Sequence, residues 1–526
     1  MEHSHARRAA DCRSCVLHYA GALLILSSAL SLITCGGAAE NTNSRGTTAL
    51  APGGPAGTVN WLDPLGYQKP AALGVAMPDE ASATKYWVNF SGGSDTASCG
   101  ASSASPCATI RGLANRNLSG LRGNSADNPA YIYIKGTGLF TLYNIGSTFA
   151  GTPGKEIVIK PWPAGSPGCS TECTFTGNDD NPTFGTGAII HDVIFDGGAD
   201  MKLVFTSDQH DPNGPKYALI IDGYNITFYR TQVKGTNSSG SNLFSVCANS
   251  TPTNCHDISF INNEFYSCNQ SAGYQCAAIY LGPCPCGGAN NCSGRNIYIK
   301  NNIMRDLGGE AIEINPRISD ADNVQVTGNA FHNVGKQTCS GTWDCRPAIT
   351  FDSCVNPAKV TNAQVNENIM WDIGGSCVWD KGGTISPPLI YNNTCYDFHK
   401  GTASGVCTQG VCGGGSATVR NNIIFAPNGT APFDGSPLTA SNNLCGSGQS
   451  CGTFKQTWSA NTVLSTDPTA SSFMTFGSIS EAKGTGIAIP GITVDYGGNP
   501  LSLTIWDIGA GVTPLGLPTP ANLRVQ

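Results

Sequence analysis

Four short segments carry the residues whose types and spacing best suit chemistry. Each alternates apolar and polar residues after a turn, in the sequences AIYLG (278–282), AIEIN (311–315), AITFD (348–352) and CVWDK (377–381). If they stack as parallel strands, the alternation turns one set inward, namely Ile279, Ile312, Ile349 and Val378. The outward column is then Tyr280, Glu313, Thr350 and Trp379, and the next column is Gly282, Asn315, Asp352 and Lys381. Two carboxylates, an ammonium and an indole would share one patch, because neighbouring strands lie about 4.8 Å apart.

This combination of side chains suits an acidic polysaccharide. β-Elimination from a uronate needs a base for the proton alpha to the carboxyl group, and a cation that neutralises that group. A second chemistry would use Glu313 and Asp352 as the acid and base of glycoside hydrolysis. Contacts to the sugar are expected from Trp379, Tyr280, Asn315, Arg317 and Arg346. Glu310 falls at the turn before its strand and is expected to be solvated or to bond within the turn.

The four segments belong to a repeated phrase in which asparagines precede an apolar residue. The clearest copies are Asn263-Glu264-Phe265, Asn301-Asn302-Ile303, Asn329-Ala330-Phe331, Asn421-Asn422-Ile423 and Asn442-Asn443-Leu444. Weaker copies end at Val233, Ile369 and Thr394. The final positions are 21 to 38 residues apart. This irregular period indicates a coil of constant size with insertions of variable length.

The repeated phrase predicts the fold class. It contains no helix of ten residues, so connections of the βαβ type are excluded. Short parallel strands without such helices pair by winding into a solenoid. The paired asparagines fit its tight turns, because asparagine tolerates the left-handed conformation, and over successive coils they would form an amide ladder. We therefore predict an all-β, right-handed parallel β-helix, with a short capping helix near residues 107–115.

The chain resembles the pectate-lyase-like superfamily of β-helix proteins, on coils that cover about residues 185–450. The opening of many secreted bacterial members is similar to TKYWVNFSGGSDTASCGASSASPCATIRGLA (84–114), and their closing segment is similar to TVDYGGNPLSLTIWDIGAG (493–511). In the lyases that it resembles, a lysine or arginine is the base, and calcium held by acids neutralises the uronate carboxylate. The resemblance thus implies Lys381 as the base, with Glu313 and Asp352 as oxygen ligands of calcium.

The sequence leaves open whether the chain is an enzyme. No tight cluster of acids and no family catalytic signature is present, so no catalytic residue carries over by motif. If the chain is an enzyme, it is expected to resemble a polysaccharide lyase, with a glycoside hydrolase as the alternative. A surface protein that binds glycan without cleaving it is a third hypothesis, favoured by the irregular insertions, because loops carry recognition.

The N-terminus predicts export. Arg7, Arg8 and Arg13 precede the apolar run AGALLILSSALSLI (20–33), which is too short to span a bilayer but suits a signal peptide. Residues 1–35 are therefore predicted to be a signal, and the sequence around Cys35 resembles a lipobox. Lipidation of Cys35 and plain secretion remain equal alternatives. Beyond the signal we expect a flexible tether (36–83), the β-helix domain (84–512) and a Pro-rich linker (513–526).

The charge balance restricts the partners. The chain has 29 basic and 36 acidic residues, for a net charge of −7, and no run of lysine or arginine. This argues against nucleic acid as a partner, because nucleic-acid interfaces are strongly basic. We expect a secreted or surface-bound monomer whose partner is a polysaccharide, with a membrane reached only through a lipid on Cys35.

Of the 23 cysteines, Cys12, Cys15 and Cys35 belong to the predicted signal, and most of the remaining 20 are predicted to form disulfides, since exported chains meet oxidising conditions. Many sit in close pairs, namely Cys99 with Cys107, Cys169 with Cys173, Cys247 with Cys255, Cys339 with Cys345, Cys407 with Cys412, and Cys445 with Cys451. The pairing stays open for Cys268, Cys276, Cys284, Cys286, Cys292, Cys354, Cys377 and Cys395. A zinc site at Cys284, Cys286 and Cys292 is the poorer alternative, because no histidine or second Cys-x-x-Cys supports it.

Overall fold

The computed structural model describes the parts of the chain that form the solenoid. They are residues 73–115, 129–139, 150–178, 190–206, 216–235, 241–247, 254–268, 276–282, 294–316, 320–335, 345–352, 359–381, 388–399, 409–413, 417–434, 439–468, 470, 472–493, 496, 500–501 and 506–510. All of them belong to one compact unit, Leu50–Gln526. The expected signal, Cys35, residues 36–72 of the tether and the linker 513–526 lie outside the described residues.

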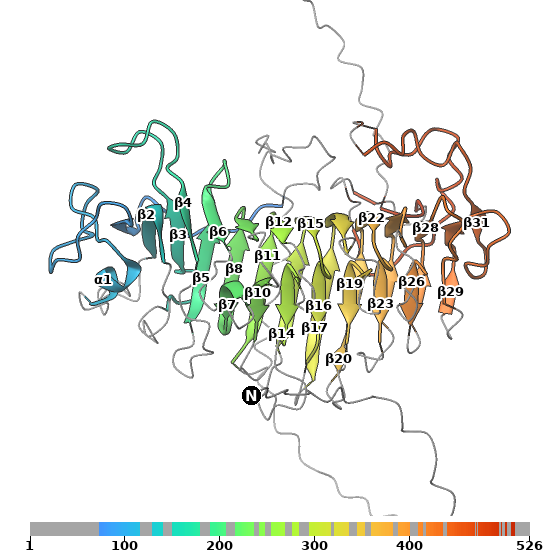
Figure 1. The fold of residues 1–526 in the computed structure, drawn as a ribbon, viewed down its shortest axis with the longest axis horizontal. Coiled ribbons are helices and arrows are strands. Elements are labelled where there is room, and N and C mark those ends of the chain that lie inside the picture. The colour runs from blue at the N-terminus through green and yellow to red at the C-terminus, as the bar shows by residue number, and fades with distance from the viewer. Residues whose placement is uncertain are drawn as a thin grey trace, which may run out of the picture. The chain divides into compact units, whose positions relative to one another are not determined.

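The strands stack along the solenoid (Figure 1) in three parallel sheets, and the third of these contains seven strands of the described residues, from residue 216 to residue 413. The first sheet contains β1 (Thr84–Asn89), β2 (Ala130–Leu139), β3 (Ile157–Pro161), β5 (Ile190–Asp196), β8 (Gly223–Tyr229), β11 (His256–Ile261), β14 (Arg295–Lys300), β17 (Ala321–Thr327), β20 (Val360–Thr361), β21 (Gln364–Asn366), β24 (Leu389–Tyr391), β27 (Thr418–Arg420) and β29 (Thr439–Ser441). The second contains the end of β2, then β4 (Phe175–Asn178), β6 (Leu203–Thr206), β9 (Gln232–Lys234), β12 (Glu264–Cys268), β15 (Ile303–Leu307), β18 (Ala330–Val334), β22 (Ile369–Ile373), β25 (Thr394–Tyr396), β28 (Ile423–Phe425), β30 (Leu444–Cys445) and β31 (Gln456–Thr457). The third contains β7 (Lys216–Ile221), β10 (Ser241–Val246), β13 (Ile279–Leu281), β16 (Ile312–Ile314), β19 (Ile349–Phe351), β23 (Val378–Asp380) and β26 (Val411–Gly413).

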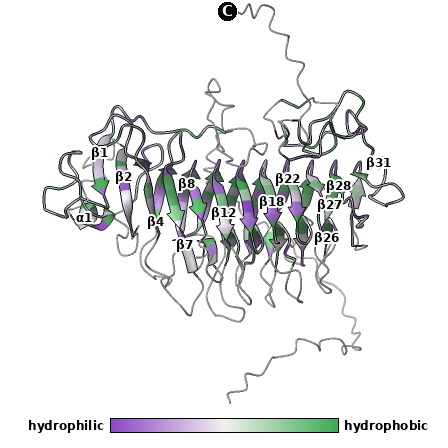
Figure 2. Ribbon diagram, turned by 45° about the horizontal axis from the view of Figure 1, so that its top comes forward, coloured by the Kyte–Doolittle hydropathy of each residue, from purple (hydrophilic) through white to green (hydrophobic). Residues whose placement is uncertain are grey.

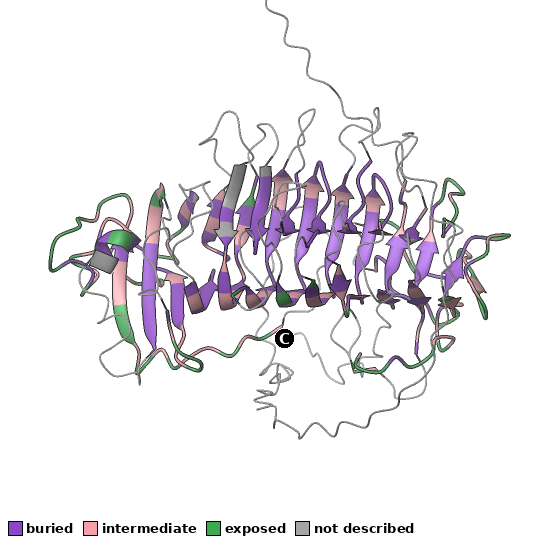
Figure 3. Ribbon diagram, turned by 90° about the horizontal axis from the view of Figure 1, so that it is seen from below, coloured by how far each residue is buried: buried purple, intermediate pink, exposed green. Residues whose placement is uncertain are grey.

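This is the right-handed parallel β-helix that the sequence predicts. Alternation turns apolar side chains inward, so that strands of every sheet are largely buried (Figures 2 and 3). Inside the solenoid, aromatic side chains of successive coils stack on one another. Phe228 lies between Phe195 and Phe260, with ring centroids 4.5 and 5.4 Å apart. Each coil therefore buries its apolar residues on its neighbours rather than within itself.

The expected amide ladder runs along the interior beside the second sheet. Its rungs are Asn263, Asn302, Asn329, Asn368, Asn393, Asn422 and Asn443. Each Nδ2 donates to the Oδ1 of the next rung over 2.9 to 3.1 Å, and each backbone N–H donates to the same oxygen. The residue before each rung has a positive φ, as at Asn301 (54°) and Asn392 (52°). The asparagine pairs thus serve both predicted purposes, the turn and the ladder.

The sequence alignment of the coils was wrong by one residue in part of the repeat. It equated Phe265 with Ile303, whereas the register pairs Phe265 with Met304 and Glu264 with Ile303. The error arose because the inward and the outward positions of this sheet both carry apolar residues. Phe265 points into the core, while Ile303 points outward and is buried by a later part of the chain. The ladder gives the true spacings of 39, 27, 39, 25, 29 and 21 residues.

The N-terminal end is capped by a helix and a disulfide loop. Helix α1 (Ile110–Asn115) begins later than expected, and its Ile110 and Leu113 are buried in the core. Cys107 donates its N–H to Trp87 O and accepts from Asn89, so the loop also covers the edge of β1. Among the described residues, no helix has the length and apolar character needed to cross a membrane.

Residues 73–83, which we expected to belong to the flexible tether, are bound to the first sheet. Leu73 exchanges two hydrogen bonds with the side chain of Asn262. Glu80 accepts from Tyr133 and forms an ion pair of 3.0 Å with Lys160. The expectation failed because the segment is held by polar partners on distant coils, which a local composition does not reveal.

The C-terminal segment covers the outer face of the second sheet. Phe473, Met474, Phe476, Ile508 and Ala510 are buried against the outward residues of that sheet, among them Ile303, Ile369, Ile423 and Leu444. Gly509 has a φ of 89°, and a Cβ there would lie 2.7 Å from Ile423. Only glycine fits this close approach. The second sheet is thus closed off along these coils, whereas the chemistry-bearing residues lie on the third.

Candidate functional site

The third sheet places the expected residues in the predicted register. Ile279, Ile312, Ile349 and Val378 pair in sequence and point inward. The neighbouring column reads Ser245, Tyr280, Glu313, Thr350, Trp379 and Cys412. The backbone ladder continues one step beyond the strands, since Asn315 N donates to Leu281 O, Asp352 N to Ile314 O and Lys381 N to Phe351 O. Asn315, Asp352 and Lys381 therefore form the next column.

Direct contacts join the members of these columns. Lys381 Nζ lies 3.0 Å from Asp352 Oδ2 and 4.4 Å from the centre of the Trp379 ring. Asn315 Nδ2 donates to the Tyr280 hydroxyl (3.3 Å) and to Glu313 Oε1 (3.4 Å). Lysine and tryptophan thus meet as a cation–π pair, and the amide connects two neighbouring coils.

Glu310 corrects one expectation. It is fully buried rather than solvated, and its Oε1 accepts from Arg346 Nη1 over 2.7 Å. Arg346 itself is almost buried, so it binds an acid of the protein rather than standing free at the edge of the patch. Arg317 lies outside the described residues.

Glu313 is the most perturbed acid of the site. It is 1% exposed although it lies on the outward column. Burial, followed by the negative charge of Glu310, raises the pKa of Glu313 to about 8. Asp352 acts in the same direction, while Lys381 and Arg346 oppose it. Burial and the neighbouring negative charges thus favour the protonated form of the Glu313 carboxyl in the free protein.

Unpartnered polar atoms gather on this sheet. Of the buried side-chain atoms that have no hydrogen-bond partner among the described residues, several lie on this sheet or in the turns before its strands, among them Ser245 Oγ, Glu310 Oε2, Glu313 Oε2, Asn315 Oδ1, Thr350 Oγ1 and Ser376 Oγ. Such atoms are rare in native interiors, because an unsatisfied buried polar group costs about 1–3 kcal/mol. They mark a place where a polar ligand or water completes the hydrogen bonds.

The contacts of Glu313 and Asp352 do not fit a calcium ion. Asp352 Oδ2 is bound by Lys381, and Glu313 Oε1 accepts from the amide of Asn315. Calcium takes about six to eight oxygen ligands. Among the described residues, Glu310, Glu313 and Asp352 do not bring three carboxylate oxygens within 4.8 Å of one another. Near Asp352, the ammonium of Lys381 already supplies the positive charge.

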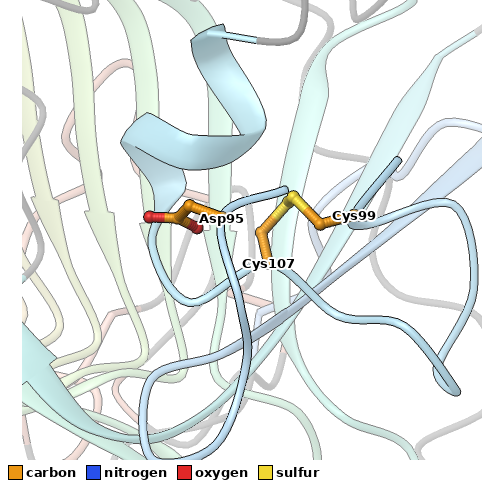
Figure 4. A group of neighbouring side chains, drawn as sticks. All are labelled: Asp95, Cys99 and Cys107. Atoms are coloured by element: carbon orange, nitrogen blue, oxygen red, sulfur yellow. A yellow bond between two sulfur atoms is a disulfide. The ribbon is translucent and has the colours of Figure 1, made fainter. Parts of the chain in front are cut away.

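One group with metal-ligand chemistry occurs in the described ranges, and it is structural. Asp95, Cys99 and Cys107 lie together beside α1 (Figure 4). The two sulfurs are joined in a disulfide, which removes the thiolates that a metal requires. Asp95 accepts from the backbone N–H of Ala108 (2.7 Å) and of Thr109 (3.0 Å), and from the Thr109 hydroxyl. The aspartate therefore orders the turn into the capping helix.

Disulfides lie next to the third sheet as well as at the ends. Four of the expected close pairs are formed, namely Cys99–Cys107, Cys169–Cys173, Cys247–Cys255 and Cys445–Cys451. Cys345 and Cys412 are also disulfide-bonded, while Cys339 and Cys407 lie outside the described residues. Two pairs that the sequence left open are Cys268–Cys276 and Cys377–Cys395. The latter begins directly before β23, which carries Trp379.

Sequence reasoning missed two kinds of residue in this site, a buried acid and buried hydroxyls. It did not identify Glu310 as buried, and it gave no weight to the hydroxyls of Ser245 and Ser376. Ser376 occupies the same register position as Glu310, two coils further on. The signal available in the sequence was the turn before each strand. Glu310 and Ser376 are polar residues in these turns, and each lies two positions before the first inward residue of its strand.

Comparisons with known proteins agree with the fold. The pectate lyase Pel9A is similar in structure, with a TM-score of 0.51 and 15% identity, over 81% of this chain and 96% of the lyase. A GH136 lacto-N-biosidase from Eubacterium ramulus matches with a TM-score of 0.36 and 11% identity, over 68% of this chain and 67% of its own. A rhamnogalacturonan lyase matches with 0.34 and 10%, over 80% and 95%. No family model matches the chain, and no curated protein does. The likeness to Pel9A shows that the chain has the parallel β-helix fold of that enzyme.

Proposed function

We propose that this protein is carbohydrate-active, and that it binds and cleaves a polysaccharide on the outer face of the third sheet. The observation that carries the proposal is the pairing of two unlike acids. Glu313 is buried and its pKa is raised, which favours the protonated form, whereas Asp352 forms an ion pair with Lys381. Two acids in environments this different suit the roles of acid and base. The names of the similar structures, which are enzymes of polysaccharides and oligosaccharides, support the substrate class.

Hydrolysis would assign different roles to the two acids. Glu313 would donate its proton to the glycosidic oxygen as the bond from the anomeric carbon to that oxygen breaks. Asp352 would take a proton from the water that attacks the same carbon. Trp379 would pack on a sugar face, and the unpartnered oxygens beside Glu313 would accept hydrogen bonds from sugar hydroxyls.

An acidic polysaccharide is the preferred substrate class. The ammonium of Lys381 is partly exposed at this face, and a sugar carboxylate would compete with Asp352 for it. β-Elimination from a uronate is the second candidate, because Lys381 stands beside the acids and could take the proton alpha to the carboxyl group. It would first have to leave Asp352 and give up its own proton.

We also infer export, to the cell surface or the medium. The support is the number of disulfides along the solenoid, since such bonds persist in oxidising compartments. Lipidation of Cys35 is tested by mass spectrometry of the mature protein from its natural host. A diacylglycerol-modified cysteine would establish the anchor, and an unmodified N-terminus downstream of it would establish secretion.

The function is tested by a screen on pectate, alginate and glycosaminoglycans. New reducing ends without ultraviolet absorbance indicate hydrolysis, and an absorbing unsaturated product indicates elimination. Glu313→Gln should abolish the hydrolytic product, whereas Asp200→Asn, at an exposed site on another face, should not. Binding without either product would identify a glycan-binding protein. Full cleavage by Glu313→Gln would contradict the proposed role.

A further inference from the structure

The outer face of the third sheet changes character along the solenoid. On the coils of β10 and β13, its two outward columns carry only uncharged residues, namely Ser245 and Tyr280 in one column and Cys247 and Gly282 in the next. On the coils of β19 and β23, the second column instead carries Asp352 and Lys381. Glu313, on β16, lies between these two parts. A polymer that lies along the sheet therefore meets an uncharged end and a charged end.

Asn315 determines the hydrogen-bonding character of the uncharged end. Its Nδ2 donates to the Tyr280 hydroxyl (3.3 Å) and to Glu313 Oε1 (3.4 Å), which uses both hydrogens of the amide. Its Oδ1 has no partner among the described residues, and the same is true of Ser245 Oγ, on the other side of Tyr280. Asn315 is 2% exposed and Ser245 is 0% exposed. A buried polar atom without a partner is costly, so both oxygens require a hydrogen bond from a bound group.

The inventory of donors and acceptors selects a neutral sugar at this end. An amide oxygen only accepts, and a carboxylate also only accepts, so a uronate carboxylate cannot complete the hydrogen bonds of Asn315 Oδ1. A sugar hydroxyl donates, and it is small enough to reach an enclosed oxygen. Asp222, which follows β7 one coil before Cys247, is a further acid that disfavours a carboxylate here.

The inventory is the opposite at Lys381. Its ammonium has three donors and no acceptor. The side chains of Lys381 and Asp352 are 20% and 21% exposed, and exposed ion pairs contribute little net free energy. A sugar carboxylate can therefore replace Asp352 as the partner of the ammonium without a large penalty. The Trp379 ring, whose centre lies 4.4 Å from the ammonium, is placed to contact the same sugar.

We propose that the third sheet binds a heteropolysaccharide, with a neutral sugar held beside Tyr280 by Asn315 and Ser245, and an acidic sugar held at Lys381. This inference rests on the binding face of the proposed function, but it does not require cleavage. The two positions are three coils apart, or about 14 Å. Because one sugar of an extended chain spans about one coil, a polymer that alternates neutral and acidic sugars satisfies both positions. A homopolymer of uronate satisfies only the charged end.

The direct test is isothermal titration calorimetry of the full-length protein with oligosaccharides of matched length. The alternating probes are rhamnose–galacturonate and N-acetylglucosamine–glucuronate oligosaccharides, and the comparison probes are oligogalacturonate and a neutral galactan. One alternating probe should bind about tenfold more tightly than both comparison probes, because only it completes the hydrogen bonds at both ends. Where a probe is cleaved, the ratio of kcat/KM replaces the ratio of affinities. Equal or tighter binding of oligogalacturonate, or no binding of either alternating probe, would overturn the proposal.

Ser245→Ala separates a role in binding from a role in the fold. Its hydroxyl has no partner in the described part of the free protein, so alanine should leave the midpoint of urea unfolding unchanged or raise it. The same variant should bind the alternating probe about fivefold more weakly and oligogalacturonate as before. A lower unfolding midpoint with unchanged binding would overturn the proposal.

Ser480→Ala is the matched control, because it removes a buried hydroxyl that is already satisfied in the C-terminal segment. Its Oγ donates to Thr462 O over 2.6 Å and accepts from Ala482 N over 3.2 Å. This variant should unfold at a lower urea concentration and bind every probe as the natural protein does, and a selective loss of the alternating probe would count against the proposal. Binding of an alternating probe without cleavage supports this inference and contradicts the proposed hydrolysis. Preferential cleavage of oligogalacturonate does the reverse, so the two failures are distinguishable.

Discussion

Lys381 binds Asp352 through an ion pair of 3.0 Å and at the same time lies over the ring of Trp379. The side chains come from two adjacent coils, so the contact exists only because β19 and β23 pair in one register. The ammonium thereby supplies a positive charge beside the aspartate for which the resemblance to lyases implied calcium. Several consequences for activity and stability can be measured.

Removal of divalent metal should leave activity unchanged. Asp352 is engaged by Lys381, and the proposed hydrolysis uses the protonated form of Glu313, so it needs no bound ion. The measurement is the initial rate on the polysaccharide identified by the screen, with EDTA and after addition of excess calcium. A rate that collapses with EDTA and recovers with calcium would instead restore the calcium hypothesis.

Trp379→Ala should weaken binding of the polysaccharide about tenfold, more than any other single aromatic substitution on the third sheet. The indole offers the largest apolar surface of the outward column, and stacking of this kind contributes about 0.5–1.5 kcal/mol beyond burial. Affinity is measured by isothermal titration calorimetry. Trp458→Ala is the control, because Trp458 stacks on Phe425 beside the second sheet, with ring centroids 4.5 Å apart. Equal losses in both variants would argue against the third sheet as the binding face.

The free energy of unfolding should fall as the pH rises because of Glu313. Its pKa is about 8 in the folded state, against an ordinary value of 4.5, so the folded state binds this proton more tightly. That contribution is fully present below about pH 4.5 and is lost as the pH rises through 8. Between about pH 5 and pH 9, Glu313→Gln should therefore lose less stability than the natural protein, by an amount on the order of a few kcal/mol. Urea unfolding at both pH values measures the difference, and parallel losses would show that Glu313 is not the group responsible.

Asn368→Ala should destabilise the fold by about 3 kcal/mol. The amide donates to Val326 O (2.8 Å) and to Asn393 Oδ1 (2.9 Å), and it accepts two hydrogen bonds from Asn329. Alanine leaves these buried partners without hydrogen bonds. The midpoint of urea unfolding should fall accordingly, while Asn461→Ala, at an exposed position, should leave it unchanged. A small effect at position 368 would mean that the ladder adjusts around a missing rung.

The coils and the register of the third sheet could be predicted from the sequence because both repeat along the chain. Alternation in AIEIN and CVWDK determined the third-sheet register, and with it the proximity of Glu313, Asp352 and Lys381. The asparagine pairs revealed the ladder for the same reason, since each coil repeats the turn and the rung. Alignment failed only where periodicity is ambiguous, at Ile303 and its counterparts, which are apolar on the outward side because the C-terminal segment covers them.

Features that depend on contacts between distant, non-repeating residues could not be predicted. The buried Glu310 is paired with Arg346 on the next coil, and the local sequence around Glu310 does not indicate this ion pair. The binding of Leu73 to Asn262 joins residues that are 189 positions apart. The protonation of Glu313 depends on four charged neighbours at once, and so needs the structure.

The ladder has a consequence for how such a chain can change. Its steps are 21 to 39 residues apart in sequence, yet every step uses the same pair of hydrogen bonds. The length of a coil is thus decoupled from the geometry of its rung. Insertions and deletions between rungs can remodel what the protein recognises without re-registering the strands, and a whole coil could be duplicated as a unit. The solenoid is in this sense a scaffold for engineering, in which recognition segments can be exchanged while the interior is left untouched.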